Sequence, residues 1–148
     1  LVFSLVGDVA LMLESDRFVL GLGAFLVAHV AYIVGFWIDP PTGAAAGVSV
    51  LVTALVMLPL ARRILGGVGG TEPALRGPVA VYIAVISVMV ASALASGLVV
   101  AAVGAVTFAA SDAMIAWSRF VRPFRGARVA IMVTYHLAQL ALVLSLVV

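Results

Sequence analysis

A long part of this chain contains no charge: no charged residue lies between Arg76 and Asp112. A helix needs roughly 20 residues to cross the hydrocarbon core of a bilayer. The stretch is therefore too long for one crossing, and we expect a hairpin of two spanning helices that turns near Ser96 and Gly97. The whole chain is 66% hydrophobic and 9% charged, against about 25% charged residues in soluble domains. The sequence predicts an integral membrane protein.

Six apolar segments can be drawn, and we interpret them as an all-α, polytopic transmembrane helix bundle that forms a single domain over residues 1–148. The predicted spans are 1–13, 18–38, 43–61, 78–96, 97–117 and 127–148. The first span is shorter than a helix needs to cross a bilayer, and the chain starts at Leu1 instead of methionine. We therefore expect a fragment that lacks upstream sequence.

The positive charges predict the orientation of the bundle. All eight are arginines, and they fall in three predicted loops, 14–17, 62–77 and 118–128. Six spans place these loops on one side of the membrane, and the positive-inside rule makes that side cytoplasmic. The C-terminus would then lie outside. Since topology explains the arginines, we expect no nucleic-acid partner, and the absence of lysine suggests a GC-rich bacterial source and a bacterial cell membrane.

Two aspartates lie inside predicted spans. Asp8 and Asp112 each precede the cytoplasmic end of their span by about five residues, or roughly 7–8 Å of helix. An intramembrane carboxylate costs about 2.5–3.5 kcal/mol on insertion scales and therefore usually faces a bundle interior or a cavity. Pairing with an interfacial arginine is the structural alternative for each. Their matched depth favours a shared site, although the sequence leaves open whether they meet.

Further polar side chains accompany them. His29 and Tyr32 lie three residues apart, and Tyr135 and Gln139 lie four apart, so each pair shares one face of its helix. These side chains are candidates for substrate binding. Hydrogen bonding between packed helices is the competing interpretation, and it is a frequent role of such residues in membranes.

The loop 118–128 spaces its arginines three residues apart. Arg119 and Arg128 are candidates for binding a lipid headgroup, because guanidinium groups bind phosphate in a bidentate manner; membrane topology alone also explains them. The chain has no cysteine and only two histidines, on different spans and deeper than the aspartates. We therefore expect no metal site and no cofactor.

Four stretches resemble the YhhN family of integral membrane proteins, which includes the animal lysoplasmalogenases. They are GDVALML, FVLGLGAFLVAHVAYIVGF, SDAMIAWSRF and TYHLAQLALVLS. The resemblance covers residues 4–37 and about 107–145, whereas the middle spans are generic. It implies an eight-helix bundle, of which this chain would hold six helices. It also implies a hydrolase that cleaves the vinyl ether bond of lysoplasmalogens. The products would be a fatty aldehyde and a glycerophospho-ethanolamine or -choline.

By the same resemblance, Asp8 and Asp112 are the candidate catalytic pair, and the shell around them is formed by His29, Tyr32, Tyr135 and Gln139. Vinyl ether hydrolysis begins with proton transfer to the β-carbon, and water then captures the oxocarbenium ion. One protonated carboxyl can supply that proton while an ionised one stabilises the cation, as paired carboxylates do in glycosidases. The sequence does not say which aspartate is the acid.

The expected partners are therefore a lysophospholipid substrate, which could also be another lysolipid or ether lipid, and the bilayer itself. Two other functions remain open. A proton-coupled small-molecule transporter would use the aspartates to bind protons or cations. A non-catalytic membrane protein would use them to hold its helices together.

Overall fold

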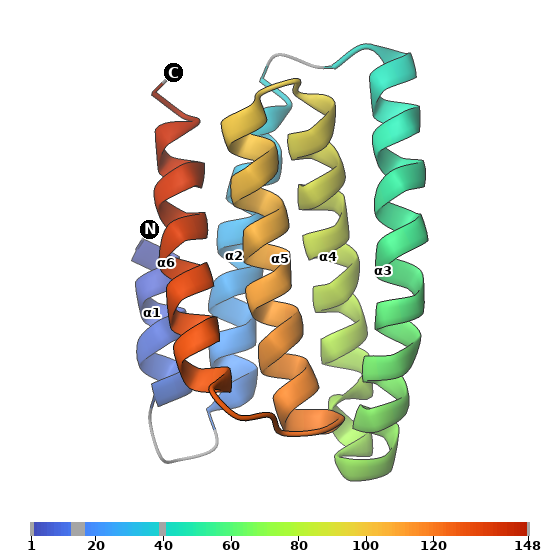
Figure 1. Cartoon of the computed structure of the whole chain (residues 1–148), viewed down its shortest axis with the longest axis vertical. Helices are drawn as coiled ribbons and strands as arrows, with labels where there is room; N and C mark the ends of the chain where they lie inside the picture. The colour runs from blue at the N-terminus through green and yellow to red at the C-terminus, as the bar shows by residue number, and fades with distance from the viewer. Residues whose placement is uncertain (1, 13–16, 39–40, 148) are drawn as a thin grey trace.

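The computed structural model describes residues 2–12, 17–38 and 41–147. Its elements are α1 (Val2–Met12), α2 (Phe18–Phe36), α3 (Gly43–Thr71), the short 3-10 turn η1 (Pro73–Leu75), α4 (Arg76–Ala95), α5 (Val99–Phe120) and α6 (Ala127–Leu144). No strand occurs in these described ranges. The helices run side by side along one axis, with α6 and α3 at opposite edges of the view (Figure 1). The prediction of an all-α helix bundle is confirmed.

Five of the helices, α2 to α6, are long and apolar enough to cross a membrane, which fits a multi-pass membrane protein. The described part of α1 has 11 residues and is shorter than a span. Most of the predicted loop 14–17 lies outside the described residues. The predicted hairpin is confirmed, because α4 ends at Ala95 and α5 begins at Val99. Gly97 in the turn has a φ of 75°, which glycine adopts at little cost.

The predicted loop 62–77 is wrong over most of its length. Helix α3 continues to Thr71, so Arg62 and Arg63 lie on a helix, and α4 already begins at Arg76. Four glycines in this part of α3 disfavour a helix by up to about 1 kcal/mol each. Packing against α5 outweighs that cost.

The lower part of α3 packs against α5. A Cβ atom at Gly67 would clash with the carbonyl oxygen of Phe120, so the glycine lets the two helices approach closely. Ile64 and Val68, with 2% and 0% of their surface exposed, join Phe18 and Phe120 in a buried cluster. Tertiary contact therefore extends α3 beyond the point where hydropathy predicts its end.

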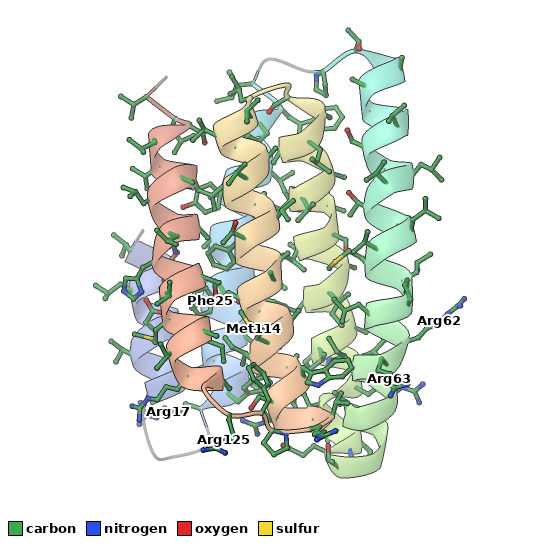
Figure 2. The ribbon with its side chains drawn as sticks, viewed as in Figure 1. Arg17, Phe25, Arg62, Arg63, Met114 and Arg125 are labelled. Carbon is green, nitrogen blue, oxygen red and sulfur yellow. The ribbon has the colours of Figure 1, made fainter. Side chains whose placement is uncertain are left out.

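The arginines gather toward one end of the bundle. Arg17 and Arg125 lie at the lower end in Figure 2, and Arg62 and Arg63 lie on the lower half of α3. The α3–α4 connection and the α5–α6 loop are at this same end (Figure 1). The arginines thus lie toward one end of the bundle, as the predicted orientation requires. The compartment that this end faces, and the bacterial source, stay predictions.

Helices α5 and α6 form the closest pair, through small residues. Ala101 and Ala105 are fully buried, and a Cβ atom at Gly104 would lie 3.0 Å from the backbone nitrogen of Leu142. Small residues of the fifth span thus allow close packing at these positions, whereas Gly97 lies in the turn. This contact fixes the α6 polar residues relative to α5.

Candidate active site

Asp112 on α5 is surrounded by polar side chains from two other helices. The hydroxyl of Tyr82, on α4, donates a hydrogen bond to Asp112 Oδ2. His29 Nε2, on α2, lies 4.0 Å from the same oxygen. The side chain of Asp112 is 12% exposed and that of His29 is 1% exposed. Three helices therefore converge on one nearly buried carboxyl group.

The hydrogen bonds of His29 fix its tautomer. Its Nδ1 lies 2.5 Å from the carbonyl oxygen of Phe25, and a carbonyl can only accept, so Nδ1 carries the hydrogen. In the neutral ring Nε2 is then an acceptor, and it has no hydrogen-bond partner within the described structure. The distance of 4.0 Å to Asp112 Oδ2 is too long for a hydrogen bond. Nε2 nevertheless lies close to the carboxyl group.

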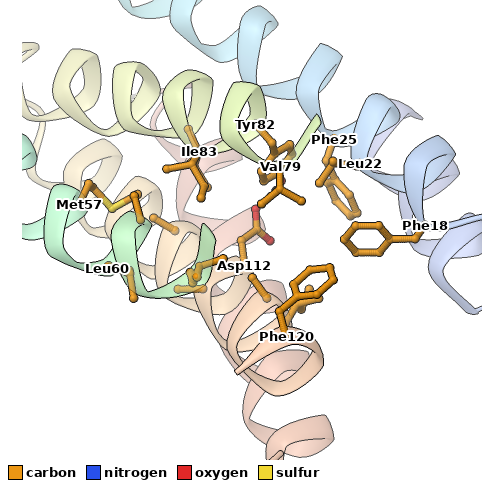
Figure 3. A pocket seen from close by; sticks show the side chains of 17 residues that line it. Phe18, Leu22, Phe25, Met57, Leu60, Val79, Tyr82, Ile83, Asp112 and Phe120 are labelled. Atoms are coloured by element: carbon orange, nitrogen blue, oxygen red, sulfur yellow. Dashed lines mark hydrogen bonds between the residues drawn. The ribbon is translucent and has the colours of Figure 1, made fainter. Parts of the chain in front are cut away.

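Asp112 also borders an apolar pocket of about 60 Å³ between α2, α3, α4 and α5. Its carboxyl group points into the space between Val79, Phe18 and Phe120 (Figure 3). Among the described lining residues, Asp112 is the only charged one, and Tyr82 is the only other polar one. A buried carboxyl group that borders an apolar pocket is suited to transferring its proton to a bound ligand that is mostly hydrocarbon.

Asp8 on α1 ends a second chain of hydrogen bonds. The hydroxyl of Tyr135 donates to Asp8 Oδ2 at 2.7 Å, and Gln139 Nε2 donates to the Tyr135 oxygen at 3.1 Å. The hydroxyl of Tyr32 in turn donates to Gln139 Oε1 at 3.0 Å. Three side chains predicted to form the shell thus connect α1, α6 and α2, and they reach Asp8 through Tyr135 instead of bonding to Asp112.

Phe108 stands between the two aspartate groups. Its ring packs edge-to-face against His29, with centroids 4.8 Å apart, and against Tyr135, with centroids 5.5 Å apart. No hydrogen bond in the described structure joins Asp8 to Asp112 directly. The two carboxyl groups therefore have separate hydrogen-bond partners, with an aromatic wall between them.

The glycine before Asp8 places α1 against this wall. A Cβ atom on Gly7 would lie 2.6 Å from Cε2 of Phe25. The Phe25 ring is itself held edge-to-face by Phe108 and Tyr135, at centroid distances of 6.0 and 5.8 Å, and it has little freedom to move away. Gly7 thus allows the approach that brings Asp8 to Tyr135.

The predicted headgroup arginines lie apart from the carboxyl groups. Arg119 Nη2 pairs with Glu72 Oε1 at 3.0 Å, and its guanidinium lies 4.2 Å from the Phe18 ring centroid. Arg128 is exposed at the start of α6, and no hydrogen bond or ion pair of Arg128 occurs in the described structure. Neither arginine contacts Asp8 or Asp112, so their role in binding stays a prediction.

Two other arginines of the same loop line a pocket. Arg122 and Arg125, together with Trp117, border a space of about 760 Å³ at the loop end of the bundle. Leu60 and Ala113 line both this space and the Asp112 pocket. The two pockets are therefore neighbours, one basic and one apolar.

Tyr82 is the site residue that sequence reasoning missed. Its span contains no charge and matches no motif, so it reads as a generic apolar helix. One signal was present: Tyr82 lies six residues after Arg76, which gives it nearly the depth of Asp112 in a neighbouring antiparallel span. His136, by contrast, is exposed; its Nδ1 donates a hydrogen bond to the Met132 carbonyl of its own helix, and its ring packs on Tyr135. No three metal-binding side chains come together among the described residues.

Comparisons with known proteins show the family of this chain. The YhhN family model matches residues 1–146, and the chain belongs to this family. It is 36% identical to human "Lysoplasmalogenase TMEM86B" over 98% of this chain and 60% of that protein. It is 37% identical to "Lysoplasmalogenase" of Mycobacterium tuberculosis over 95% of this chain and 56% of that protein. The chain thus spans about 60% of the length of these curated relatives, and no solved structure matches it.

Proposed function

We propose that this chain carries the active site of a lysoplasmalogenase, a membrane-embedded hydrolase that cleaves the vinyl ether bond of lysoplasmalogens. The observation that carries the proposal is the nearly buried carboxyl group of Asp112 beside an apolar pocket, with Tyr82 and His29 facing it. The names of the relatives support the same activity. A site of this kind suits an acid-catalysed reaction of a lipid.

In the proposed reaction Asp112 is the general acid. Tyr82 binds Oδ2, which leaves Oδ1 to carry the proton. The O–H bond of the acid breaks as the π electrons of the vinyl ether form a C–H bond at the β-carbon, and the ether oxygen stabilises the resulting oxocarbenium ion. Water then adds to this cation and returns a proton to Asp112. The hemiacetal that forms collapses to a fatty aldehyde and the free glycerol hydroxyl, so one water molecule is consumed in each turnover.

Asp8 is then the ionised partner. Its Oδ2 accepts a hydrogen bond from Tyr135, which Gln139 supports in turn, whereas Asp112 borders an apolar pocket; the more polar surroundings suit the ionised group. A fixed negative charge near a developing cation stabilises the transition state without further reorganisation. Asp8 acts in this scheme across the shared wall of Phe25 and Phe108, by its charge and not by contact with the scissile bond.

The substrate headgroup fits the basic end of the site. Arg122 and Arg125 border the pocket next to that of Asp112, and guanidinium groups are good phosphate ligands. A lysophospholipid with its phosphate near these arginines would place its first chain carbons toward Asp112. This direction agrees with the predicted depth of Asp112, a few residues from the end of its span.

The test is aldehyde release from lysoplasmenyl-ethanolamine by membranes that contain the protein, expressed from its full-length gene. Asp112→Asn and Asp8→Asn are compared with wild type at equal amounts of folded protein. Tyr32→Phe, which alters a hydrogen bond away from Asp112, is the matched control. We expect aldehyde from wild type and the control, and nearly none from Asp112→Asn.

The competing functions predict other results. A transporter would release no aldehyde and would carry a proton flux that depends on the same aspartates. A structural role would lower the amount of folded Asp112→Asn protein but leave the turnover of the folded fraction unchanged. The first result would refute the hydrolase, and the second would refute the catalytic role of Asp112.

A further inference from the structure

A third cavity lies between α3 and α4, beside the Asp112 pocket. It holds about 400 Å³ and is lined mainly by small and aliphatic side chains. Ala54 on α3 and Ala84 and Ala91 on α4 are typical of its walls. Trp37 borders one end and donates from its Nε1 to Ser92 Oγ at 2.9 Å. We call this cavity the α3–α4 groove.

The groove continues from the candidate active site. Met57, Ala61 and Ile83 line both the α3–α4 groove and the pocket of Asp112. No polar side chain is among these three shared residues. A hydrocarbon chain could therefore pass from the carboxyl group into the groove without crossing a polar barrier.

The length of the groove matches a lipid chain. On α4 its lining extends from Ala80 to Ala95, which at 1.5 Å per residue is about 22 Å of helix. One leaflet of a bilayer contributes about 15 Å of hydrocarbon. A chain that normally fills one leaflet thus fits along the groove, with its far end toward Trp37.

We infer that the α3–α4 groove binds the alkenyl chain of the lysolipid and selects substrates by chain length. The inference rests on the proposed function, and it adds a second binding region to it. The basic pocket of Arg122 and Arg125 receives the phosphate, Asp112 faces the vinyl ether, and the chain runs between α3 and α4. The three adjoining cavities thus set one direction for the substrate.

The serine hydroxyl groups in the groove agree with an apolar occupant. Ser87 and Ser92 donate to carbonyl oxygens of their own helix, at 2.6 and 2.8 Å, so their hydrogen bonds are made without a ligand. Thr53 is 5% exposed, and its hydroxyl has no hydrogen-bond partner in the described structure. A hydrocarbon chain would leave that hydroxyl unpaired, whereas a polar ligand would bind it, so Thr53→Val distinguishes the two kinds of occupant.

The experiment fills the groove and measures chain-length preference. The protein, expressed from its full-length gene, is assayed in membranes with lysoplasmenyl-ethanolamines that carry short, medium or long alkenyl chains. Ala84→Phe introduces a ring into the groove. Ala110→Phe, at an exposed alanine of α5 outside the three pockets, is the matched control. Thr53→Val removes the unpaired hydroxyl and keeps the shape of the side chain.

We expect Ala84→Phe to lower kcat/KM for long chains by about tenfold relative to short chains, since one methylene in an apolar pocket is worth 10–200-fold. Ala110→Phe and Thr53→Val should keep the wild-type profile. An unchanged chain-length profile in Ala84→Phe would refute chain binding in the α3–α4 groove. Aldehyde release would still support the hydrolase. An equal loss on all chains with less folded protein would refute it too, because that result indicates a packed protein segment in the groove. A loss of activity in Thr53→Val would indicate a polar ligand and likewise overturn it.

Discussion

Asp8 and Asp112 are the same kind of side chain in two different surroundings. Each accepts a hydrogen bond from a tyrosine of another helix. Beyond the tyrosine the two surroundings differ. At Asp8, the tyrosine accepts a further hydrogen bond from Gln139. Asp112 instead borders an apolar pocket and lies close to the unpaired Nε2 of His29. Surroundings that differ in this way divide two carboxyl groups into an acid and an ionised partner. The pair therefore need not be symmetric to act together.

The largest effect should come from the acid. Asp112→Asn keeps the shape of the side chain but cannot supply a proton to carbon, and general acid catalysis contributes about 10²–10⁴-fold. We expect kcat for aldehyde release to fall by that amount, with the amount of folded protein unchanged in detergent. Retention of a third or more of the wild-type kcat would show that Asp112 is not the acid.

Asp8→Asn should cost less, because it removes a charge that acts at a distance. Loss of one stabilising electrostatic group typically lowers kcat by about 10²–10³-fold, and we expect the lower end here, since Phe108 separates the two groups. The measurement is kcat for both variants in one assay. If Asp8→Asn proves more harmful than Asp112→Asn, the two roles must be exchanged.

Gly7→Ala tests how Asp8 is positioned. The added methyl group meets the confined ring of Phe25, and overpacking of this kind costs about 1–3 kcal/mol. We expect a lower unfolding temperature and reduced activity. Gly23→Ala in α2, where an added Cβ has nothing within 4 Å, is the control and should stabilise the helix slightly. Equal behaviour of the two variants would show that Gly7 has no special role.

The smallest effect belongs to the far end of the Asp8 chain. Tyr32→Phe removes the hydrogen bond to Gln139 Oε1, and side-chain hydrogen bonds within membranes contribute on average about 0.6 kcal/mol. We expect a small loss of stability, measured by unfolding in detergent, and turnover close to wild type. A tenfold fall in kcat would mean that the hydrogen bonds from Tyr32 to Asp8 take part in the chemistry.

The predictions that succeeded rest on local patterns with a large energetic cost. The uncharged run between Arg76 and Asp112 forces a hairpin, and a carboxylate inside a span needs a polar partner. Asp8 and Asp112 both have one. The i, i+4 spacing of Tyr135 and Gln139 likewise predicts the hydrogen bond that joins them.

The predictions that failed or missed depend on contacts between distant segments. Charge and glycine indicate a loop after Ala61, but close packing of Gly67 on Phe120 keeps α3 helical. Tyr82 becomes a site residue only because α4 lies beside α5. No pattern within one span contains that information.

The most direct test of the central claim is to run the reaction in heavy water. If the acid transfers its proton to the β-carbon of the vinyl ether, the aldehyde gains one deuterium on the carbon next to the carbonyl. Immediate reduction to the alcohol prevents later exchange, and unlabelled aldehyde carried through the same steps is the control. The account predicts one deuterium per product molecule in the mass spectrum. An alcohol with no deuterium on that carbon would contradict it.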